Sequence, residues 1–259
     1  MPSDDSSAPP APSLSIVVPA YNEEGRIGAT LDAVIAYMDA RGGGSWELLV
    51  VDDGSSDGTG DVVREHAGKR AEVALVRYDP NAGKGRAVRM GMLRARGERV
   101  LFSDADLATP IEELEHLMAA LDGGADIAIG SRDVPGAQLE RRQSAIREAG
   151  GKLFNRFVQA LAVPGIHDTQ CGFKLFTRAS AQAVFRLCQV DNFSFDVEAL
   201  YLARRLGLAI VETPVRWRHQ EGSKVRFVRD AVRMLATLRR IRTTRYDLAP
   251  VTSDRPGAR

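Results

Sequence analysis

The sequence has no long apolar run and no excess of charge of one sign. Nowhere in its 259 residues is there a stretch approaching the roughly 18 to 20 apolar residues that span a membrane, so no such helix is expected. The formal net charge of +1 excludes a globally basic nucleic-acid binder, although a local basic patch is compatible with it. With 44% hydrophobic and 27% charged residues, the composition is that of a globular protein with a sizeable core.

Cysteine is scarce, and the ends of the chain lack targeting features. Cys171 and Cys188 do not have the spacing of a metal site, which favours free thiols in a cytosolic protein. Residues 1–12 are rich in proline and serine but have no basic or apolar segment, so we expect a disordered leader rather than a secretory signal. A disordered tail is expected at 247–259. No internal repeat divides the remainder, so residues 13–246 are expected to form one domain.

Strand and helix patterns alternate through the first half of the chain. Strands are expected at 14–20, 46–55, 71–78, 97–106 and 125–132, and helices at 26–40, 59–67, 85–96 and 109–121. Thr109 is expected to cap the last of these helices, with Pro110 at its first position. Repeated units of this kind predict an α/β fold with a mostly parallel sheet and helices on both faces.

The regular alternation stops after residue 132. Residues 133–151 are polar and basic and predict a mobile loop. The pattern then predicts helices at 152–162, 195–207 and 224–245, and a strand at 208–217.

Acidic and small polar residues follow each of the first four expected strands. The segments are PAYNEE (19–24), DDGSSDGT (52–59), DPNAGKG (79–85) and SDADLATP (103–110). Turns favour such residues for backbone reasons, so each segment alone has a purely structural explanation. Because ligands of parallel sheets bind at the carboxyl ends of the strands, we expect the four segments to form one site.

Five segments resemble, in the same order, the family 2 inverting glycosyltransferases of the GT-A fold. They are IVVPAYNEE (16–24), VVDDGSSDGT (50–59), NAGKGRAVRMGM (81–92), DADLATP (104–110) and DTQCGFKLF (168–176). The likeness is strongest to polyprenyl- or dolichyl-phosphate sugar synthases of the glucosyl type. It implies a Rossmann-like GT-A domain with a C-terminal helical extension. It also implies Mg²⁺ or Mn²⁺, and transfer of a hexose, with glucose preferred, from a UDP-sugar to polyprenyl phosphate.

Asp104 and Asp106 are the candidate metal ligands. Two carboxylates this close repel each other and resist burial unless a cation joins them, and Mg²⁺ or Mn²⁺ prefers such oxygens. We expect Asp106 to bind the metal and Asp104 to help hold the metal and the ribose or sugar. Relatives of the mannosyl type have a glutamine where this sequence has Ala108, so water or the diphosphate must complete the site, and a glucosyl-type donor is favoured.

The resemblance places the nucleotide-sugar in the first loops. Four residues match the family's nucleotide-binding first loop: Pro19, Ala20, Tyr21 and Glu23. Asp53 matches its base-contacting acid, and a carboxylate can accept an N–H of uracil or guanine. Gly83 and Gly85 flank Lys84, which allows close approach to phosphate, although a turn with a solvated lysine is the alternative.

Arginines are the candidates for the acceptor phosphate. Arg132 follows the fifth expected strand and matches the family's acceptor-phosphate arginine. Arginine binds phosphate through paired charge-assisted hydrogen bonds, and a phosphate acceptor requires positioning more than a base. Three further candidates, each with a solvated basic loop as the alternative, are Arg141, Arg142 and Arg147. Trp217 and Lys224 are expected to close the acceptor side, where Lys224 is also a candidate for the phosphate.

Two acidic segments are candidates for the sugar side of the site. Asp168 and Gln170 match a family segment beside the sugar, and Asp168 would be a base if the acceptor were an alcohol. The adjacent His167 is more often structural or solvated in such a setting. Asp196 and Glu198 resemble another family segment, which lines or supports the site.

Residues 224–245 predict a basic amphipathic helix. Its apolar stripe consists of Val225, Val228, Val232, Leu235 and Leu238. One interpretation is a helix packed on the core with a solvated basic face. The other is a helix lying on anionic lipid, where each basic residue contributes about 1 kcal/mol. The second would make a cytoplasmic enzyme peripheral at the inner face of a membrane.

Two other functions are compatible with the sequence. One is a soluble family 2 transferase acting on a hydroxyl of a small-molecule or cell-envelope acceptor, with Asp168 or Asp196 as base. The other is a sugar-nucleotide-binding protein without transferase activity, which the intact acids disfavour. The expected partners are a UDP-sugar, polyprenyl phosphate and a membrane surface, but no nucleic acid, and a homo-oligomer is compatible with the sequence.

Overall fold

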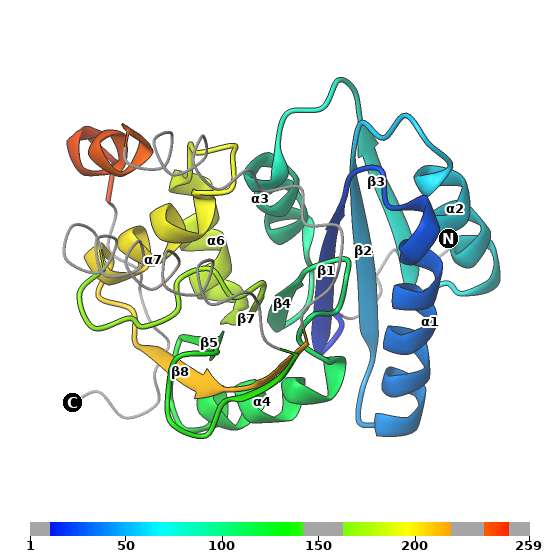
Figure 1. Ribbon diagram of the computed structural model, residues 1–259, viewed down its shortest axis with the longest axis horizontal. Coiled ribbons are helices and arrows are strands. Elements are labelled where there is room, and N and C mark those ends of the chain that lie inside the picture. The colour runs from blue at the N-terminus through cyan, green and yellow to red at the C-terminus, as the bar shows by residue number, and fades with distance from the viewer. Residues whose placement is uncertain (1–10, 142–162, 219–235, 249–259) are drawn as a thin grey trace, which may run out of the picture.

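A seven-stranded sheet with helices on both faces forms the centre of the molecule (Figure 1). The computed structural model describes residues 11–141, 163–218 and 236–248. The first half contains β1 (Leu14–Ala20), α1 (Glu24–Arg41), β2 (Trp46–Asp53), α2 (Thr59–Lys69), β3 (Val73–Tyr78), α3 (Lys84–Arg94) and β4 (Arg99–Ser103). These elements confirm the strand and helix predictions for this part of the chain.

The second half begins with a short 3-10 helix, η1 (Ile111–Glu113), which leads into α4 (Leu114–Asp122). It continues with β5 (Ile127–Ser131), β6 (Gln138–Arg141), β7 (Phe173–Thr177), α6 (Arg178–Leu187), α7 (Phe195–Arg205), β8 (Ile210–Pro214) and β9 (Arg216–Arg218). A helix also covers residues 236–243.

Three sequence predictions need correction here. Pro110, not Thr109, precedes the 3-10 turn, and no side chain caps it. Instead the buried Thr109 hydroxyl lies 3.6 Å from the sulfur of Cys171, so it has a hydrogen-bond partner in the protein interior and does not cap the helix. The strand expected at 208–217 is divided into β8 and β9, and the loop expected at 133–151 contains strand β6. Helix α6 was not predicted.

Strand β7 determines the form of the site. The strand order is β3-β2-β1-β4-β7-β5-β8, and β7 is antiparallel to both of its neighbours, whereas the other pairs are parallel. This confirms a mostly parallel sheet. Because β7 runs in the opposite direction, the residues that precede it lie beside the residues that follow β4. The N–H of Asp104 accordingly donates to the carbonyl of Gly172 over 2.9 Å.

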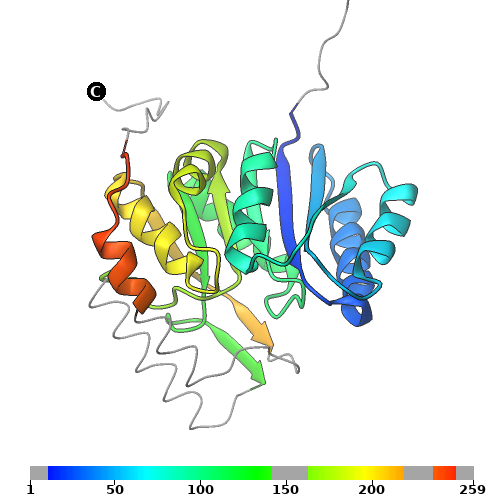
Figure 2. The ribbon, with the colours of Figure 1, turned by 90° about the horizontal axis from the view of Figure 1, so that it is seen from above.

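Two apolar layers hold the sheet between the helices (Figure 2). Alternate residues of one strand enter opposite layers: Val17 belongs to the layer that includes residues of α3, α6 and α7, and Ile16 belongs to the layer that includes residues of α1, α2 and α4. Full burial of such a side chain contributes about 1.5–3 kcal/mol, so the continuous apolar strands anchor the polar loops at their ends.

Residues 236–243 lie beside α7 (Figure 1). Leu238 and Ile241 are buried in the apolar layer of α7, while Arg239 and Arg240 are exposed. This confirms the core-packed interpretation for Leu238; the predicted stripe from Val225 to Leu235 lies outside the described residues. Among the helices of the described ranges, none is long and apolar enough to cross a membrane.

Candidate functional site

The first two predicted loops are joined by hydrogen bonds. The N–H of Asn22 donates to Oγ of Ser55 over 2.9 Å, and the N–H of Glu23 donates to Oγ1 of Thr59 over 2.8 Å. Tyr21, next to them, is 38% exposed. Pro19 and Ala20, which end β1, are buried below the loop.

Asp53 is almost completely buried at the end of β2 and holds the third loop. Its Oδ1 accepts the N–H of Ala82 over 2.7 Å. Its Oδ2 accepts the N–H of Gly83 and the side-chain amide of Asn81, each over 2.9 Å. The predicted contact of Asp53 with a base stays a prediction, and the observed role is to anchor the loop that contains Lys84.

Lys84 is the cationic partner of Asp104. Its Nζ lies 2.6 Å from Oδ1 of Asp104 and faces the rings of Phe102 and Phe193 at 5.5 and 5.7 Å. Burial opposes the charge, but the carboxylates of Asp104 and Asp196 outweigh it and raise the pKa of Lys84. A charged lysine is therefore held at the carboxyl end of β4.

Gly172 also belongs to the site, although it was not among the site residues predicted from the sequence. A Cβ atom there would lie 1.9 Å from Oδ2 of Asp104, so only glycine leaves room for this carboxylate. The signal was present in the CGF triplet of the DTQCGFKLF segment.

Asp106 lies one turn further along the same loop. Its Oδ1 accepts the N–H of Ala108 over 3.0 Å, and Leu107 between them has a φ of 45°. Burial, and then the charge of Asp104, raise the pKa of Asp106. A bound cation would relieve both effects.

The residues present fit a divalent cation that the substrate helps to bind. Asp104 and Asp106 provide two carboxylates from one loop, and no group of three or more metal-binding side chains occurs in the described part of the chain. Mg²⁺ is commonly held by one or two carboxylates plus substrate phosphates. The diphosphate of a nucleotide-sugar would supply the remaining ligands.

Arg132 and Asp168 form a fixed pair on the other side of the loop. Nε and Nη2 of Arg132 donate to the two carboxylate oxygens over 2.6 and 2.8 Å, and the backbone N–H adds a third bond of 3.0 Å. Burial opposes both charges, yet each partner outweighs it, so the pKa of Arg132 is raised and that of Asp168 is lowered. The guanidinium also lies 5.3 Å from the ring of Trp217.

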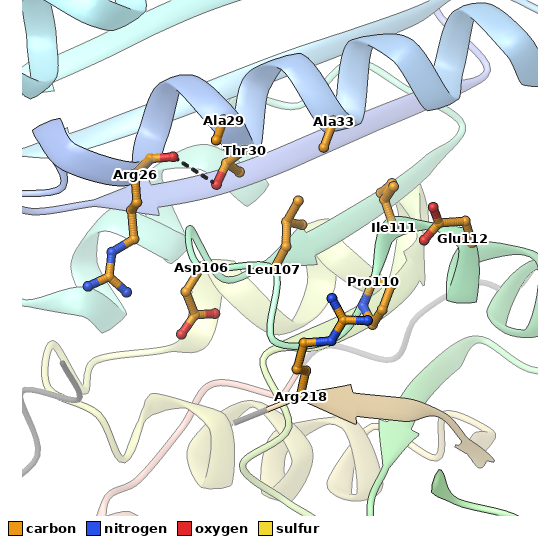
Figure 3. Close-up of a pocket in the computed structure, with 10 residues that line it drawn as sticks. All are labelled: Arg26, Ala29, Thr30, Ala33, Asp106, Leu107, Pro110, Ile111, Glu112 and Arg218. Atoms are coloured by element: carbon orange, nitrogen blue, oxygen red, sulfur yellow. Dashed lines mark hydrogen bonds between the residues drawn. The ribbon is translucent and has the colours of Figure 1, made fainter. Parts of the chain in front are cut away.

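A small cavity of about 110 Å³ lies between the Asp104–Asp106 loop and Arg132. Its lining includes Asp104, Asp106, Arg132, Gln170, Gly172 and Trp217. A larger cleft of about 790 Å³ adjoins it at Asp106 and Leu107 and runs between α1 and η1. In Figure 3, Arg26 and Asp106 lie near one end of this cleft, and Glu112 lies at the other.

The remaining candidates have other surroundings. Nδ1 of His167 pairs with Glu212 over 2.8 Å, and Asp196 is buried 2.5 Å from Nζ of Lys174, so both take part in internal ion pairs. Arg141 ends β6, which pairs with β9. The predictions for Arg142, Arg147 and Lys224 lie outside the described residues.

Comparison with known proteins agrees with this geometry. The profile described as Glycosyl transferase family 2 matches residues 15–185. The chain belongs to glycosyl transferase family 2. It is 42% identical over 234 residues to the dolichyl-phosphate beta-glucosyltransferase of Drosophila melanogaster, covering 83% of this chain and 70% of the fly protein. It is 40% identical over 232 residues to the human protein of that name, with the same two shares.

A solved structure has the same fold. Glucosyl-3-phosphoglycerate synthase from Mycobacterium tuberculosis, in complex with phosphoglyceric acid, superposes with a TM-score of 0.66. It is 20% identical in sequence and covers 88% of this chain and 79% of its own. The resemblance to family 2 and the GT-A fold is thus confirmed. The chain is a glycosyltransferase, which sets aside the alternative of a binding protein without transferase activity.

Proposed function

We propose that this glycosyltransferase moves glucose from UDP-glucose to the phosphate of dolichyl or another polyprenyl phosphate. The observation that carries the proposal is Arg132, which Asp168 holds at the cavity lined by Asp104 and Asp106. A guanidinium fixed beside the donor site suits an acceptor that is itself an anion. The relatives named dolichyl-phosphate beta-glucosyltransferase support this choice of donor sugar and acceptor.

Asp106 and Asp104 would hold Mg²⁺ or Mn²⁺ together with the diphosphate of the donor. Such a cation, when bound, neutralises the diphosphate and stabilises UDP as the leaving group. Lys84, already charged at Asp104, supplies a further cation to the phosphates.

In the reaction, an oxygen of the acceptor phosphate attacks the anomeric carbon of glucose. The bond from that carbon to the UDP oxygen breaks, and its electron pair leaves with UDP. Arg132 orients the attacking phosphate. No proton has to be removed, because the acceptor phosphate is an anion at neutral pH.

The nearby acidic side chains already have internal partners, and this favours a phosphate acceptor over a hydroxyl acceptor. A hydroxyl acceptor requires a base, and Asp168 and Asp196 were the candidates. Both oxygens of Asp168 accept hydrogen bonds from Arg132. Asp196 is buried against Nζ of Lys174 over 2.5 Å. Neither carboxylate is free to take a proton from an acceptor.

The exposed arginines of the C-terminal helix support a peripheral location at an anionic membrane. Arg239, Arg240 and Arg242 are exposed, whereas Leu238 and Ile241 on the same helix are buried. A basic surface of this kind is attracted to anionic lipid by about 1 kcal/mol for each residue near the surface. It would bring the enzyme to a lipid acceptor.

One transfer assay tests the proposal. The purified protein is incubated with Mg²⁺ and a short polyprenyl phosphate, together with labelled UDP-glucose, UDP-GalNAc or GDP-mannose. We expect label in the organic phase only with polyprenyl phosphate, and most of it with UDP-glucose. Transfer only to alcohols or water-soluble metabolites would overturn the acceptor, and preference for another donor would overturn the sugar.

A further inference from the structure

Glu198 is a fully buried carboxylate that the proposed reaction does not use. It lies in α7 and its Oε2 accepts the N–H groups of Gln189 and Val190 over 2.9 and 2.8 Å. Its Oε1 accepts the hydroxyl of Tyr246 over 2.8 Å. Burial, and then the bond to Glu198, raise the pKa of Tyr246, so this phenol remains a donor. Burying a carboxylate is costly, and these donors offset the cost.

The segment that Glu198 holds lies directly against the loop that contains Lys84. The N–H of Gly85 donates to the carbonyl of Asp191 over 2.8 Å. A Cβ atom on Gly83 would lie 2.3 Å from that carbonyl oxygen, and one on Gly85 would lie 2.4 Å from the carbonyl oxygen of Val190. The two backbone segments therefore touch without any side chain between them.

Helix α3 is tied to the same segment one turn later. Nη1 of Arg89 donates to the carbonyl of Cys188 over 2.6 Å, and its Nη2 lies 3.1 Å from the carboxylate of Asp191. The segment 188–191 thus supports both the loop at the start of α3 and the helix itself. Any shift of this segment would be transmitted to Lys84 through backbone contacts.

We propose that Glu198 is a positioning residue for the donor diphosphate. Its carboxylate holds the segment 188–191 in place. That segment in turn fixes the position of the Lys84 side chain relative to Asp104. Tyr246 holds the carboxylate from the C-terminal side, so the segment that follows the last helix contributes to the donor site. This inference rests on the proposed function, in which Lys84 binds the donor phosphates.

Glu212 provides a matched control on the acceptor side. Its carboxylate accepts the N–H groups of His167 and Asp168 over 2.7 and 2.9 Å. It therefore makes the same pair of bonds to successive backbone N–H groups, but those bonds hold the partner of Arg132. Replacing either glutamate removes the same kind of bond from opposite sides of the site.

The experiment measures UDP affinity by calorimetry in Mg²⁺ for Glu198→Leu, Glu198→Gln and Glu212→Leu, with circular dichroism and melting temperature as folding checks. Glu198→Leu is expected to weaken UDP binding by about tenfold or more, since small displacements of a binding group have large effects. Glu198→Gln is expected to retain most of the affinity, because its carbonyl can accept both N–H groups and its NH₂ can donate to Tyr246. Glu212→Leu is expected to leave UDP affinity unchanged and to raise the acceptor KM.

A double-mutant cycle separates positioning from general loss of stability. In the background of Lys84→Met, Glu198→Leu should weaken UDP binding little further. Independent, multiplicative effects would overturn the inference, as would wild-type UDP affinity in folded Glu198→Leu. If that variant does not fold, Tyr246→Phe replaces it in the cycle, and wild-type affinity would again overturn the inference. If Lys84→Met alone binds UDP normally, the assignment of Lys84 in the proposed function fails instead.

Discussion

The ammonium group of Lys84 lies 2.6 Å from Oδ1 of Asp104 and joins the loop before α3 to the end of β4. Two segments about twenty residues apart in the sequence thereby meet over a single ion pair. The ammonium group also lies over the ring of Phe102, 5.5 Å from its centre. The candidate site thus contains a positive charge that the chain supplies itself.

Lys84→Met is expected to lower kcat/KM for UDP-glucose by about 10²-fold or more, because a preorganised charge on the donor phosphates is lost. Steady-state kinetics with varied donor measures this effect. Lys84→Arg keeps the charge but not its compact shape, so we expect an intermediate loss. Equal activity of the methionine variant and the wild type would contradict a phosphate-binding role.

Asp106→Asn is expected to abolish transfer but to stabilise the protein without metal. Burial and the neighbouring Asp104 raise the pKa of Asp106, so its charge is unfavourable in the fold and asparagine removes it. A gain of 1 kcal/mol would raise the melting temperature by about 2–4 °C in a protein of this size. Transfer assays and thermal unfolding in EDTA measure the two effects.

The wild-type protein should gain thermal stability when Mn²⁺ and UDP are added together, and the Asp106→Asn variant should not. Binding of ligand to the native state alone produces such a shift. Retained activity in the variant would exclude Asp106 as the metal ligand.

Gly172→Ala is expected to impair both folding and activity. The added Cβ would lie 1.9 Å from Oδ2 of Asp104, and overpacking of this kind typically costs about 1–3 kcal/mol. Denaturant unfolding and transfer assays measure the effects. Gly68→Ala in α2 is the matched control: nothing lies within 4 Å of its Cβ position, so we expect a neutral or stabilising change of up to about 1 kcal/mol.

Asp168→Asn is expected to raise the acceptor KM by about 10–10²-fold with little effect on UDP binding. The neutral amide cannot hold the guanidinium of Arg132 by two charged hydrogen bonds. Arg132→Lys should have a similar effect, because lysine lacks the planar fork. A change confined to the donor KM would contradict the assignment of this pair to the acceptor.

The Cys171 thiol gives a prediction on alkaline stability. Burial, and then the charge of Asp168, raise its pKa from 9.0 to about 11. The unfolded chain loses this proton at lower pH than the folded protein. The contribution of the protonated thiol is therefore full below pH 9 and is lost as the pH rises toward 11.

Cys171→Ser should be less sensitive than the wild type to a rise from pH 8 to pH 10.5. The difference in free energy of unfolding between the two proteins is expected to change by roughly 2 kcal/mol over this range. Denaturant unfolding at both pH values measures it, and Cys188 is present in both proteins. Parallel pH dependence would show that the thiol does not titrate as described.

The sequence was sufficient to predict the strands and helices of the first half, because continuous apolar strands and amphipathic helices have distinct periods. It also placed Asp104, Asp106 and Lys84 together, since residues at the carboxyl ends of parallel strands share one edge. The closeness of Lys84 to Asp104 depends on side-chain packing and had no local signal.

The second half was harder to predict for a physical reason. Strand β7 is antiparallel, so its functional segment precedes it, whereas the other loops follow their strands. The bonds of Asp53 to residues 81–83 and of Glu212 to residues 167–168 connect distant parts of the chain. Such bonds depend on tertiary contacts that periodicity does not report.

The reversed direction of β7 also places the predicted nucleotide-binding loops and the partner of Arg132 on separate segments of the chain. The predicted nucleotide-binding loops follow β1 to β4, whereas Asp168, the partner of Arg132, precedes β7 and is supported by Glu212. Under the proposed roles, exchange of residues 163–169 for the corresponding segment of a relative leaves Gly172 against Asp104, and should alter the acceptor KM while leaving UDP affinity unchanged. In the proposed function, this topology would let acceptor choice evolve separately from donor binding.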